Sequence, residues 1–261
     1  RKTVNLQSRA PAPRKAVPRK TPAMNTFMSG RLLKTLCIIT IARLIPLCLH
    51  SVNMQRYQAV IFDFDGTLVN SFPWFSNVFN EVALRYRFRP VEAHEVEHLR
   101  HLEPAAIMEH LNISRWKVPF VAAHFRRLAE RDIAHMHLHE GIAQSLMHLA
   151  HSGVKLGIVS SNLERNVRHV LRTDIAGRIS AFGCGASLFG KGRLLQTLIR
   201  RMKVPAEECI YIGDEVRDYH ASRFAGADFG GVAWGYSRPD ALLKLKPDRF
   251  LTAVTQLREL A

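Results

Sequence analysis

Short apolar runs alternate with stretches of helical periodicity from Tyr57 to the end of the chain. The runs that predict strands are Ala59–Phe62, Val154–Val159, Ile179–Phe182, Cys209–Ile212, Gly231–Trp234 and Arg249–Leu251. The helical patterns between them cover Ile142–His151, Leu163–Leu171, Leu194–Met202 and Arg217–Phe224. This alternation favours a parallel sheet with helices on both faces. We therefore expect an α/β, doubly wound, Rossmann-like fold, which binds its ligand at the carboxyl ends of the strands.

The interval between the first two predicted strands, residues 71–137, breaks this alternation. It contains no convincing strand, and its apolar residues recur near helical spacing. An interval of this length is too long for a single crossover helix. We therefore expect an inserted α-helical cap at residues 71–137, on a core formed by residues 54–70 and 138–261.

Aromatic and histidine residues are concentrated in this predicted cap and just after it. The aromatic residues near its start are Phe72, Trp74, Phe75 and Phe79. We expect them to pack in the cap core or at its hinge, and not to form a cofactor site. Two histidine pairs have the i,i+4 spacing that can bind a metal on a helix, namely His94/His98 and His135/His139. No carboxylate and cysteine context supports such a site, so solvated cap surfaces are the favoured interpretation.

The basic residues are distributed unevenly along the chain. The formal net charge of +15 is typical of proteins that bind nucleic acids or membrane surfaces. Residues 1–53 contain ten Lys and Arg residues and neither Asp nor Glu, whereas residues 54–261 contain 27 basic and 22 acidic residues. The strong positive charge therefore belongs to an N-terminal tail, and the predicted folded part is only mildly basic.

Residues 1–53 allow three interpretations. Residues 1–30 are rich in Pro, Arg and Lys, which predicts disorder, and the apolar stretch Leu32–Leu49 is interrupted by Lys34, Arg43 and Pro46. The segment could be a signal or membrane anchor, or an organelle-targeting peptide. Alternatively, translation begins at Met54 and the segment is not native. We favour the last interpretation and leave residues 1–53 out of the fold.

The four cysteines are widely spread and form no Cys-x-x-Cys pair. This spacing supports neither a zinc site nor a disulfide framework, and it fits a reducing compartment. We expect a cytoplasmic protein, unless a native N-terminal segment directs it to an organelle or anchors it in a membrane.

Two aspartates follow the first predicted strand in the sequence Asp63-Phe64-Asp65-Gly66-Thr67. Side chains two residues apart on a strand point the same way, so both carboxylates face one spot at the edge of the sheet. Burying two like charges together is costly unless a cation or a shared proton compensates. A solvated Asp-Gly loop is the alternative, but the apolar strand before Asp63 disfavours it.

Further polar side chains follow the other strands. Ser160 ends the second strand, Lys191 lies ahead of the helix that leads to the fourth, and Asp214 and Asp218 follow the fourth. Singly, Ser160 could be a helix N-cap, Lys191 a surface lysine and Asp218 a first-turn acid. If the second and fourth strands flank the first, however, all of them converge with Asp63. Four carboxylates, a lysine and a hydroxyl in one cleft suit phosphoryl transfer with Mg²⁺.

In this order and on these elements, the motifs resemble those of the haloacid dehalogenase superfamily, over about residues 57–255. Beyond the residues above, the resemblance includes the segments Gly213-Asp214-Glu215-Val216-Arg217-Asp218, Trp234-Gly235-Tyr236 and Lys246-Pro247-Asp248. The last two segments and the position of the cap resemble the phosphoglycolate-phosphatase-like branch. Two features depart from the commonest pattern: Ser stands at 160 where Thr is frequent, and Lys191 is followed by Gly-Arg instead of a Pro-containing segment.

The resemblance implies a role for each residue of the predicted site. Asp63 would be the nucleophile and Asp65 the general acid and base. The predicted phosphate-binding residues are Ser160, Asn162, Lys191, Gly66 and Thr67. The predicted Mg²⁺ site comprises Asp63, Asp65 through its main-chain carbonyl, Asp214 and Asp218, of which Asp218 would act through water or by holding Lys191.

The resulting hypothesis is a Mg²⁺-dependent phosphatase that hydrolyses a small phosphorylated metabolite through an aspartyl-phosphate, with phosphoglycolate as the family-level candidate. A phosphomutase of the same superfamily would keep both aspartates. A non-catalytic basic protein that binds nucleic acid or a membrane surface is a further alternative, supported by the acid-free tail. Because the set of site residues is intact, we expect no nucleic-acid partner, and no membrane contact unless residues 1–53 are a native anchor.

Overall fold

A parallel six-stranded sheet with the strand order β3-β2-β1-β4-β5-β6 forms the centre of the protein in the computed structural model. The model describes residues 57–186 and 190–261, so the predictions for residues 1–53 lie outside the described residues. The strands are β1 (Ala59–Phe62), β2 (Lys155–Val159), β3 (Ile179–Gly183), β4 (Cys209–Gly213), β5 (Asp228–Val232) and β6 (Arg249–Leu251). The predicted doubly wound α/β fold is confirmed.

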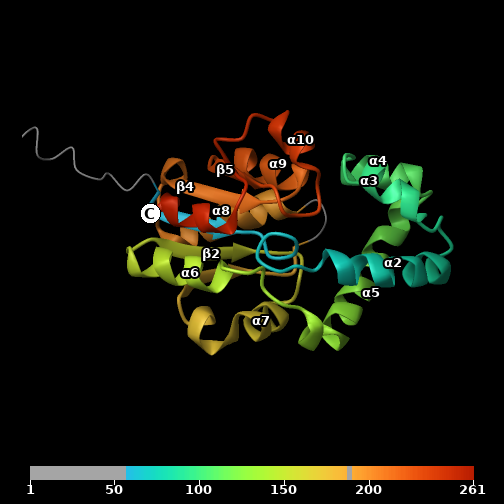
Figure 1. Ribbon diagram of the computed structural model, residues 1–261, viewed down its shortest axis with the longest axis horizontal. Helices are drawn as coiled ribbons and strands as arrows, with labels where there is room; N and C mark the ends of the chain where they lie inside the picture. Colours follow the sequence, from blue (N-terminus) through green and yellow to red (C-terminus); the bar gives the residue numbers. More distant parts are fainter. Residues whose placement is uncertain (1–56, 187–189) are drawn as a thin grey trace, which may run out of the picture. The chain divides into compact units, whose positions relative to one another are not determined.

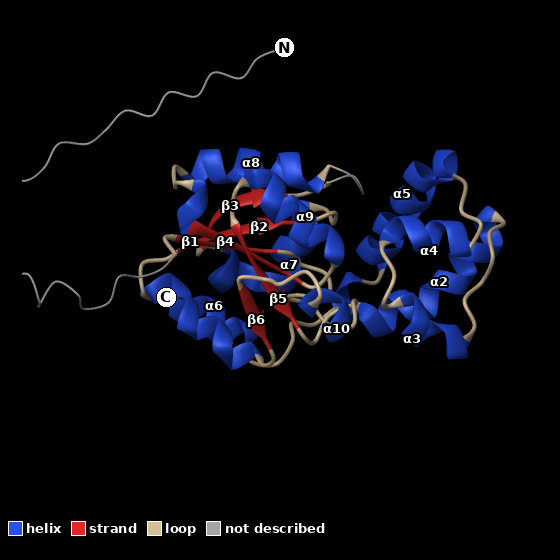
Figure 2. Ribbon diagram, turned by 90° about the horizontal axis from the view of Figure 1, so that it is seen from above, coloured by secondary structure: helices blue, strands red, loops and turns tan. Residues whose placement is uncertain are grey.

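Helices cover both faces of this sheet (Figures 1 and 2). The helices of the sheet region are α6 (Ile142–His151), α7 (Glu164–Ala176), α8 (Lys191–Met202), α9 (Val216–Ala225), α10 (Pro239–Leu243) and the 3₁₀ helix η5 (Val254–Leu260). On β1, Val60 and Phe62 pack into the cluster that contains α6, α7 and η5, whereas Ala59 and Ile61 pack into the cluster that contains α8 and α9. The alternation of side chains along β1 thus fills both cores, which explains why all four of its residues are apolar and buried.

Several element boundaries differ from the prediction, and those of the fifth strand and of α8 bear on the site. The fifth strand is Asp228–Val232 and not Gly231–Trp234, because β5 pairs with β4 from Asp228 onward. Trp234 leaves the sheet and donates a hydrogen bond from Nε1 to the carbonyl of Thr67, at 3.0 Å. Helix α8 begins at Lys191 and not at Leu194, with Gly190 as its N-cap, so Lys191 is the first helical residue and does not lie ahead of the helix.

The segment between β1 and β2 is helical, as predicted. Its elements are α2 (Phe72–Tyr86), η1 (Ala93–Glu95), α3 (Val96–Leu99), α4 (Pro104–His110), η2 (Arg115–Lys117), α5 (Val118–Arg131) and η3 (Ile133–His135). Figure 1 shows helices α2 to α5 grouped together. Helices α2 and α5 share a small core around Val78, Val82 and Val121. We call residues 71–137 the helical segment. Gln55–Ala261 forms one compact unit, so the predicted boundaries of a separate cap stay a prediction.

The aromatic residues of α2 pack as predicted, some in the core of the helical segment and some at its hinge. Phe79 stacks on Phe125 of α5, with ring centroids 6.0 Å apart. Phe72 and Phe75 contact the ring of Tyr236, which follows β5, at centroid distances of 5.2 and 5.6 Å. In the described part of the chain, no helix combines the length and the apolar character that a membrane span requires.

Candidate active site

The register of the three central strands brings the predicted site residues together. Phe62 at the end of β1 pairs with Ile158 on β2 and with Ile212 on β4. The next residue, Asp63, continues this alignment, because its amide donates to the Ile212 carbonyl at 2.8 Å. Strands β2 and β4 therefore flank β1, the condition on which the predicted convergence depended. The residues after these strands meet where the strand order changes direction, which is the usual ligand position in this class of fold.

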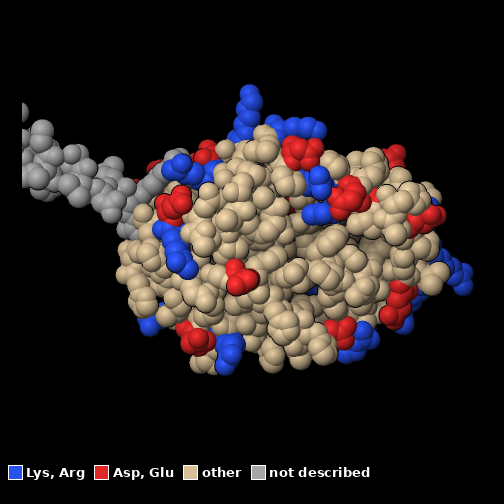
Figure 3. Space-filling view, viewed as in Figure 1, with Lys and Arg blue, Asp and Glu red and all other residues tan. Residues whose placement is uncertain are grey.

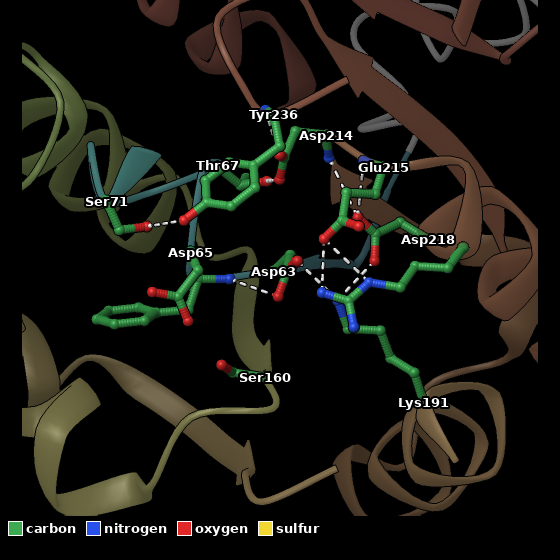
Figure 4. Close-up of polar contacts among 12 residues, drawn as sticks. Asp63, Asp65, Thr67, Ser71, Ser160, Lys191, Asp214, Glu215, Asp218 and Tyr236 are labelled. Carbon is green, nitrogen blue, oxygen red and sulfur yellow. Dashed lines mark hydrogen bonds and ion pairs between the residues drawn. The ribbon is translucent and has the colours of Figure 1, made fainter. Parts of the chain in front are cut away.

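Asp63 and Asp218 share the ammonium group of Lys191 (Figure 4). Lys191 Nζ lies 2.6 Å from Oδ2 of Asp63 and 2.6 Å from Oδ1 of Asp218, and all three side chains are buried. Burial raises the pKa of Asp63 to about 7, although Lys191 acts in the opposite direction. Burial also disfavours the charged ammonium, but the charges of Asp218 and Asp63 outweigh it and raise the pKa of Lys191. Lys191 therefore stays charged. The positive charge beside Asp63 is too small to compensate fully for the burial of its carboxylate.

The carboxylate of Asp214 is held by two donors from distant parts of the chain. Thr67 Oγ1 donates to Oδ1 at 2.6 Å, and the amide of Tyr236 donates to Oδ2 at 2.7 Å. Burial, together with the charges of Glu215, Asp218 and Asp63, raises the pKa of Asp214 well above its usual value. The two donors thus fix the position of Asp214, but nearby positive charge does not balance its negative charge.

Asp65 has a different environment from Asp63. Its side chain is partly exposed, and its Oδ2 accepts a hydrogen bond from Asn162 Nδ2 at 3.3 Å. Burial raises the pKa of Asp65, and hydrogen bonds from Asn162 and Ser71 partly offset this effect. The two aspartates that the sequence placed together therefore have different partners, Lys191 for Asp63 and Asn162 for Asp65. Separate environments of this kind are what separate chemical roles require.

The predicted phosphate-binding residues fall into two groups. Ser160 is buried, and its Oγ accepts a hydrogen bond from the amide of Asn162 at 2.9 Å, which leaves its hydroxyl proton available for a ligand. Thr67, in contrast, uses its hydroxyl proton on Asp214, so only its main chain could contact a phosphate. Gly66 has φ +81°, and a Cβ there would lie 2.3 Å from Oδ2 of Asp214. The turn after Asp65 therefore requires glycine for its conformation and for its close approach to Asp214.

The acidic residues of the site could hold a divalent cation. Within the described residues, one group of His, Cys, Asp or Glu offers three ligand atoms within 4.8 Å of one another, and it consists of Asp63, Asp214 and Asp218. Hard, buried carboxylate oxygens suit Mg²⁺, and a cation would supply the missing positive charge. The donor set therefore fits the predicted Mg²⁺. The side chain of Asp65 lies outside this group, and its contribution through a main-chain carbonyl stays a prediction.

Asp218 differs from the other two acids because its carboxylate accepts from more donors than that of Asp63 or Asp214. Besides Lys191, Oδ1 faces the hydroxyl of Tyr211 at 3.5 Å. Oδ2 accepts the amides of Asp214 and Glu215 at 3.2 and 3.0 Å. The ammonium and the two amides suit a residue that orients Lys191 and the start of α9 more than one that binds a metal directly. Asp63 and Asp214 are the better direct ligands.

Four residues of the site were given no role in it from the sequence, although His139 was considered as one of a possible metal-binding pair, His135/His139. Tyr211 lies in β4, and Lys191 Nζ lies over its ring. In the sequence, an aromatic residue within an apolar run indicates a core position. Arg217 is held by Glu215, whose Oε1 lies 2.9 Å from Nε and 2.5 Å from Nη2. His139 contacts the Gly66 carbonyl through Nε2, at 3.2 Å. Tyr236 belongs to the Trp234-Gly235-Tyr236 segment, which supported the family resemblance but was given no role.

Comparisons with known proteins agree with this geometry. A family model described as haloacid dehalogenase-like hydrolase matches residues 60–232. A phosphoglycolate phosphatase of Synechococcus elongatus is 31% identical over 208 residues, which cover 77% of this chain and 98% of the relative. A tyrosine-protein kinase, PtkA, of Mycobacterium tuberculosis is 27% identical over 209 residues, covering 77% of this chain and 72% of the relative. A solved structure from Lactobacillus plantarum, described as a candidate phosphoglycolate phosphatase, aligns with a TM-score of 0.67 at 25% identity, over 78% of this chain and 99% of that one.

Proposed function

Because this chain belongs to the haloacid dehalogenase-like hydrolases, we propose that it is a Mg²⁺-dependent phosphatase that hydrolyses a small phosphorylated metabolite through an aspartyl-phosphate. The observation that carries this proposal is the contrast between two neighbouring carboxyl groups. Asp63 is buried against the ammonium of Lys191, whereas Asp65 is partly exposed and bound to Asn162. The first arrangement suits a fixed nucleophile and the second a group that exchanges a proton with substrate or water.

In the first step, a carboxylate oxygen of Asp63 attacks phosphorus, and the bond from phosphorus to the leaving oxygen breaks. Asp65 donates its proton to that leaving oxygen, which departs as an alcohol. Lys191 and the Ser160 hydroxyl bind the oxygens of the transferring group, which carry the developing charge. In the second step, water attacks phosphorus, Asp65 takes the proton from that water, and the bond to Asp63 breaks. Inorganic phosphate is released, and both aspartates return to their starting states.

Asp63 and Asp214 would hold the Mg²⁺ ion, and Asp218 would support them. When bound, the ion offsets the carboxylate charges and lets an anionic phosphate approach an anionic nucleophile. The raised pKa values of Asp63 and Asp214 support this assignment, because both reflect buried negative charge without sufficient compensation.

Phosphoglycolate is the first substrate to test, because the relative from Synechococcus elongatus is named for that activity. The fold and the catalytic carboxylates do not determine the leaving group. A phosphomutase would use the same two aspartates and would return the phosphoryl group to its product instead of to water.

The described residues give little support to a non-catalytic basic binding protein. On the face that Figure 3 shows, acidic and basic side chains are interspersed. A nucleic-acid-binding face would instead gather Lys and Arg. Most of the excess of positive charge lies in residues 1–53, and no nucleic-acid partner is part of the proposal.

The test is a phosphatase screen over small phosphorylated metabolites, with Mg²⁺ and with EDTA, on the wild type and Asp63→Asn. We expect Mg²⁺-dependent release of phosphate by the wild type and a loss of at least about 10³-fold in Asp63→Asn, as for other variants that lack a nucleophile. Acid-quenched wild-type reactions should contain phosphate bound covalently to protein. A wild type that hydrolyses nothing, or an Asp63→Asn variant as active as the wild type, would contradict the proposal. Transfer of the phosphoryl group to a second sugar phosphate in place of water would instead identify a mutase.

A further inference from the structure

The loop formed by Gly235, Tyr236 and Ser237 is packed directly against Asp214. The amide of Tyr236 donates to Oδ2 of Asp214 at 2.7 Å, and the amide of Ser237 reaches the Asp214 carbonyl at 3.3 Å. A Cβ on Gly235 would lie 2.0 Å from Cβ of Asp214, so the loop lies as close to this residue as a glycine allows. Any displacement of this loop must therefore move or release the carboxylate of Asp214. We call residues 235–237 the Asp214 loop.

One side chain of the helical segment holds this loop from the other side. Arg100, which follows α3, donates from Nε to the carbonyl of Tyr236 at 2.8 Å and from Nη2 to the carbonyl of Gly235 at 3.0 Å. The carbonyl of Arg100 in turn accepts the amide of Arg238 at 3.0 Å. Its guanidinium therefore spans two successive carbonyls of the loop, while its main chain pairs with the residue that follows the loop.

Further contacts orient the Arg100 guanidinium. It lies over the ring of Phe72, 5.0 Å from the centroid. Its Nη1 donates to Oε1 of Glu97 at 2.9 Å, and Oε2 of Glu97 lies 3.0 Å from Nη1 of Arg238. Arg100 is thus fixed by its neighbours, and its other two nitrogens, Nε and Nη2, donate to the loop. An arginine fork held on both sides gives a defined geometry that a single ammonium cannot reproduce.

The side chain of Tyr236 adds a second connection between the same parts. Its hydroxyl lies 3.0 Å from Oγ of Ser71, the residue before α2. Its ring contacts Phe72 and Phe75. Tyr236 therefore binds the helical segment through its side chain and its carbonyl, and binds Asp214 through its amide.

We propose that Arg100 is a positioning residue that couples the docking of the helical segment to the orientation of Asp214, and so to the affinity of the site for Mg²⁺. The inference rests on the proposed function, because it takes Asp214 as a ligand of that ion. Docking of α3 through Arg100 fixes the Asp214 loop, and the loop fixes Oδ2 of Asp214. Since coupling between two sites is reciprocal, Mg²⁺ binding also strengthens the docking of the helical segment.

The first experiment measures Mg²⁺ binding by isothermal titration calorimetry on metal-free full-length protein. The variants are Arg100→Ala, which removes the fork, and Arg100→Lys, which keeps the charge but cannot span both carbonyls. Arg131→Ala is the matched control, because Arg131 is also a paired arginine of the helical segment and its partner is Asp132, away from the loop. We expect Arg100→Ala to raise the Kd for Mg²⁺ by about fivefold or more, the lower end of typical coupling. Arg100→Lys should weaken binding to a smaller extent, and Arg131→Ala should bind as the wild type does.

The second experiment tests reciprocity by hydrogen exchange, a measurement that needs no turnover. In the wild type, Mg²⁺ should slow amide exchange across α3 (Val96–Leu99), and in Arg100→Ala this protection should be lost. A purely structural role for Arg100 would change exchange in α3 equally with and without Mg²⁺. Circular dichroism establishes whether each variant is folded. If Arg100→Ala is not folded, the comparison is made with Arg100→Lys.

The outcomes separate this inference from the proposed function. If the wild type neither binds Mg²⁺ nor releases phosphate, the proposed function is wrong. If the wild type does both, but folded Arg100→Ala binds Mg²⁺ within about twofold of the wild type, the coupling role of Arg100 is wrong while the phosphatase stands. Equal weakening in Arg131→Ala would also overturn the coupling, because it would show a general effect of removing an arginine.

Discussion

Lys191 Nζ lies 2.6 Å from Oδ2 of Asp63, and both side chains are almost completely buried. The ammonium also contacts Asp218, so that one cation faces two carboxylates and the buried group keeps an excess of negative charge. A partly compensated buried charge is sensitive to the loss of its partner. The ion pair therefore links the stability of the fold to the chemistry of the site.

Replacing Lys191 by Met should lower both the stability of the fold and the activity of the site. The substitution keeps the length of the side chain but leaves Asp63 and Asp218 as adjacent, unpaired charges. We expect a loss of about 3–5 kcal/mol in the free energy of unfolding and a fall in kcat of about 10²- to 10³-fold. Chemical denaturation and steady-state kinetics measure these effects. Lys155→Met is the control, because the Lys155 ammonium is also hydrogen-bonded, to the carbonyl of Met202, but lies outside the site. Equal losses in the two variants would contradict the special role of the buried pair.

Gly66→Ala should disturb Asp214 through its added Cβ. That atom would lie 2.3 Å from Oδ2 of Asp214, at a position with φ +81°. Gly153→Ala is a matched control, because Gly153 has φ +87° with nothing within 4 Å of the added Cβ. The control should cost about 1–2 kcal/mol of stability from backbone strain alone. Gly66→Ala should cost about 1–3 kcal/mol more, and it should weaken Mg²⁺ binding as well. Thermal unfolding and calorimetry measure the two effects. Equal losses of stability in the two variants would show that Asp214 moves aside at no cost in free energy and would contradict the prediction.

The effect of Asp214→Asn on the stability of the protein should change sign when Mg²⁺ is added. Without metal, the substitution relieves buried negative charge, so we expect a Tm equal to or above that of the wild type in EDTA. With Mg²⁺, the wild type gains binding energy that the variant loses, so the wild type should then have the higher Tm. Asparagine can still accept the amide of Tyr236 and pair with Thr67, which keeps the local structure. A variant that Mg²⁺ stabilises as much as it stabilises the wild type would exclude Asp214 as a ligand.

Asp132 should stabilise the protein in a pH-dependent manner. Hydrogen bonding from Arg131 lowers the pKa of Asp132 to about 2, and Trp74 also donates to this carboxylate, at 2.9 Å. A carboxyl with a lowered folded-state pKa contributes stability above its unfolded pKa, which is lost as the pH falls through the folded pKa. Asp132→Asn should therefore be less stable than the wild type at pH 7, and the difference should disappear between about pH 4 and pH 2. The difference should not exceed about 1 kcal/mol, because water screens the Arg131 contact. Denaturation across this range measures it, and a difference that persists at pH 2 would contradict the assignment.

Much of the fold could be predicted from local patterns. The boundaries of β1, β6 and α6 coincide with those predicted, because each is an uninterrupted apolar or amphipathic run with a clear start and end. The start of β5 was misplaced because the pairing with β4 sets that boundary, and pairing is a property of two strands. The carboxylates of the candidate site could also be predicted, since Asp63 and Asp214 each follow a buried strand directly.

The sequence by itself determined the alternation of strands and helices, the helical insertion and the residue types needed for phosphoryl transfer, because periodicity and local motifs encode which side chains become buried and where the chain turns. Tertiary structure alone decided which partners those residues have. Thr67 binds Asp214, and Arg100 binds the loop that holds Asp214, across 147 and 135 residues of chain. Many hydroxyls and guanidinium groups in the sequence could chemically make these contacts. Only the packing of the sheet against its helices brings these particular ones within hydrogen-bonding distance.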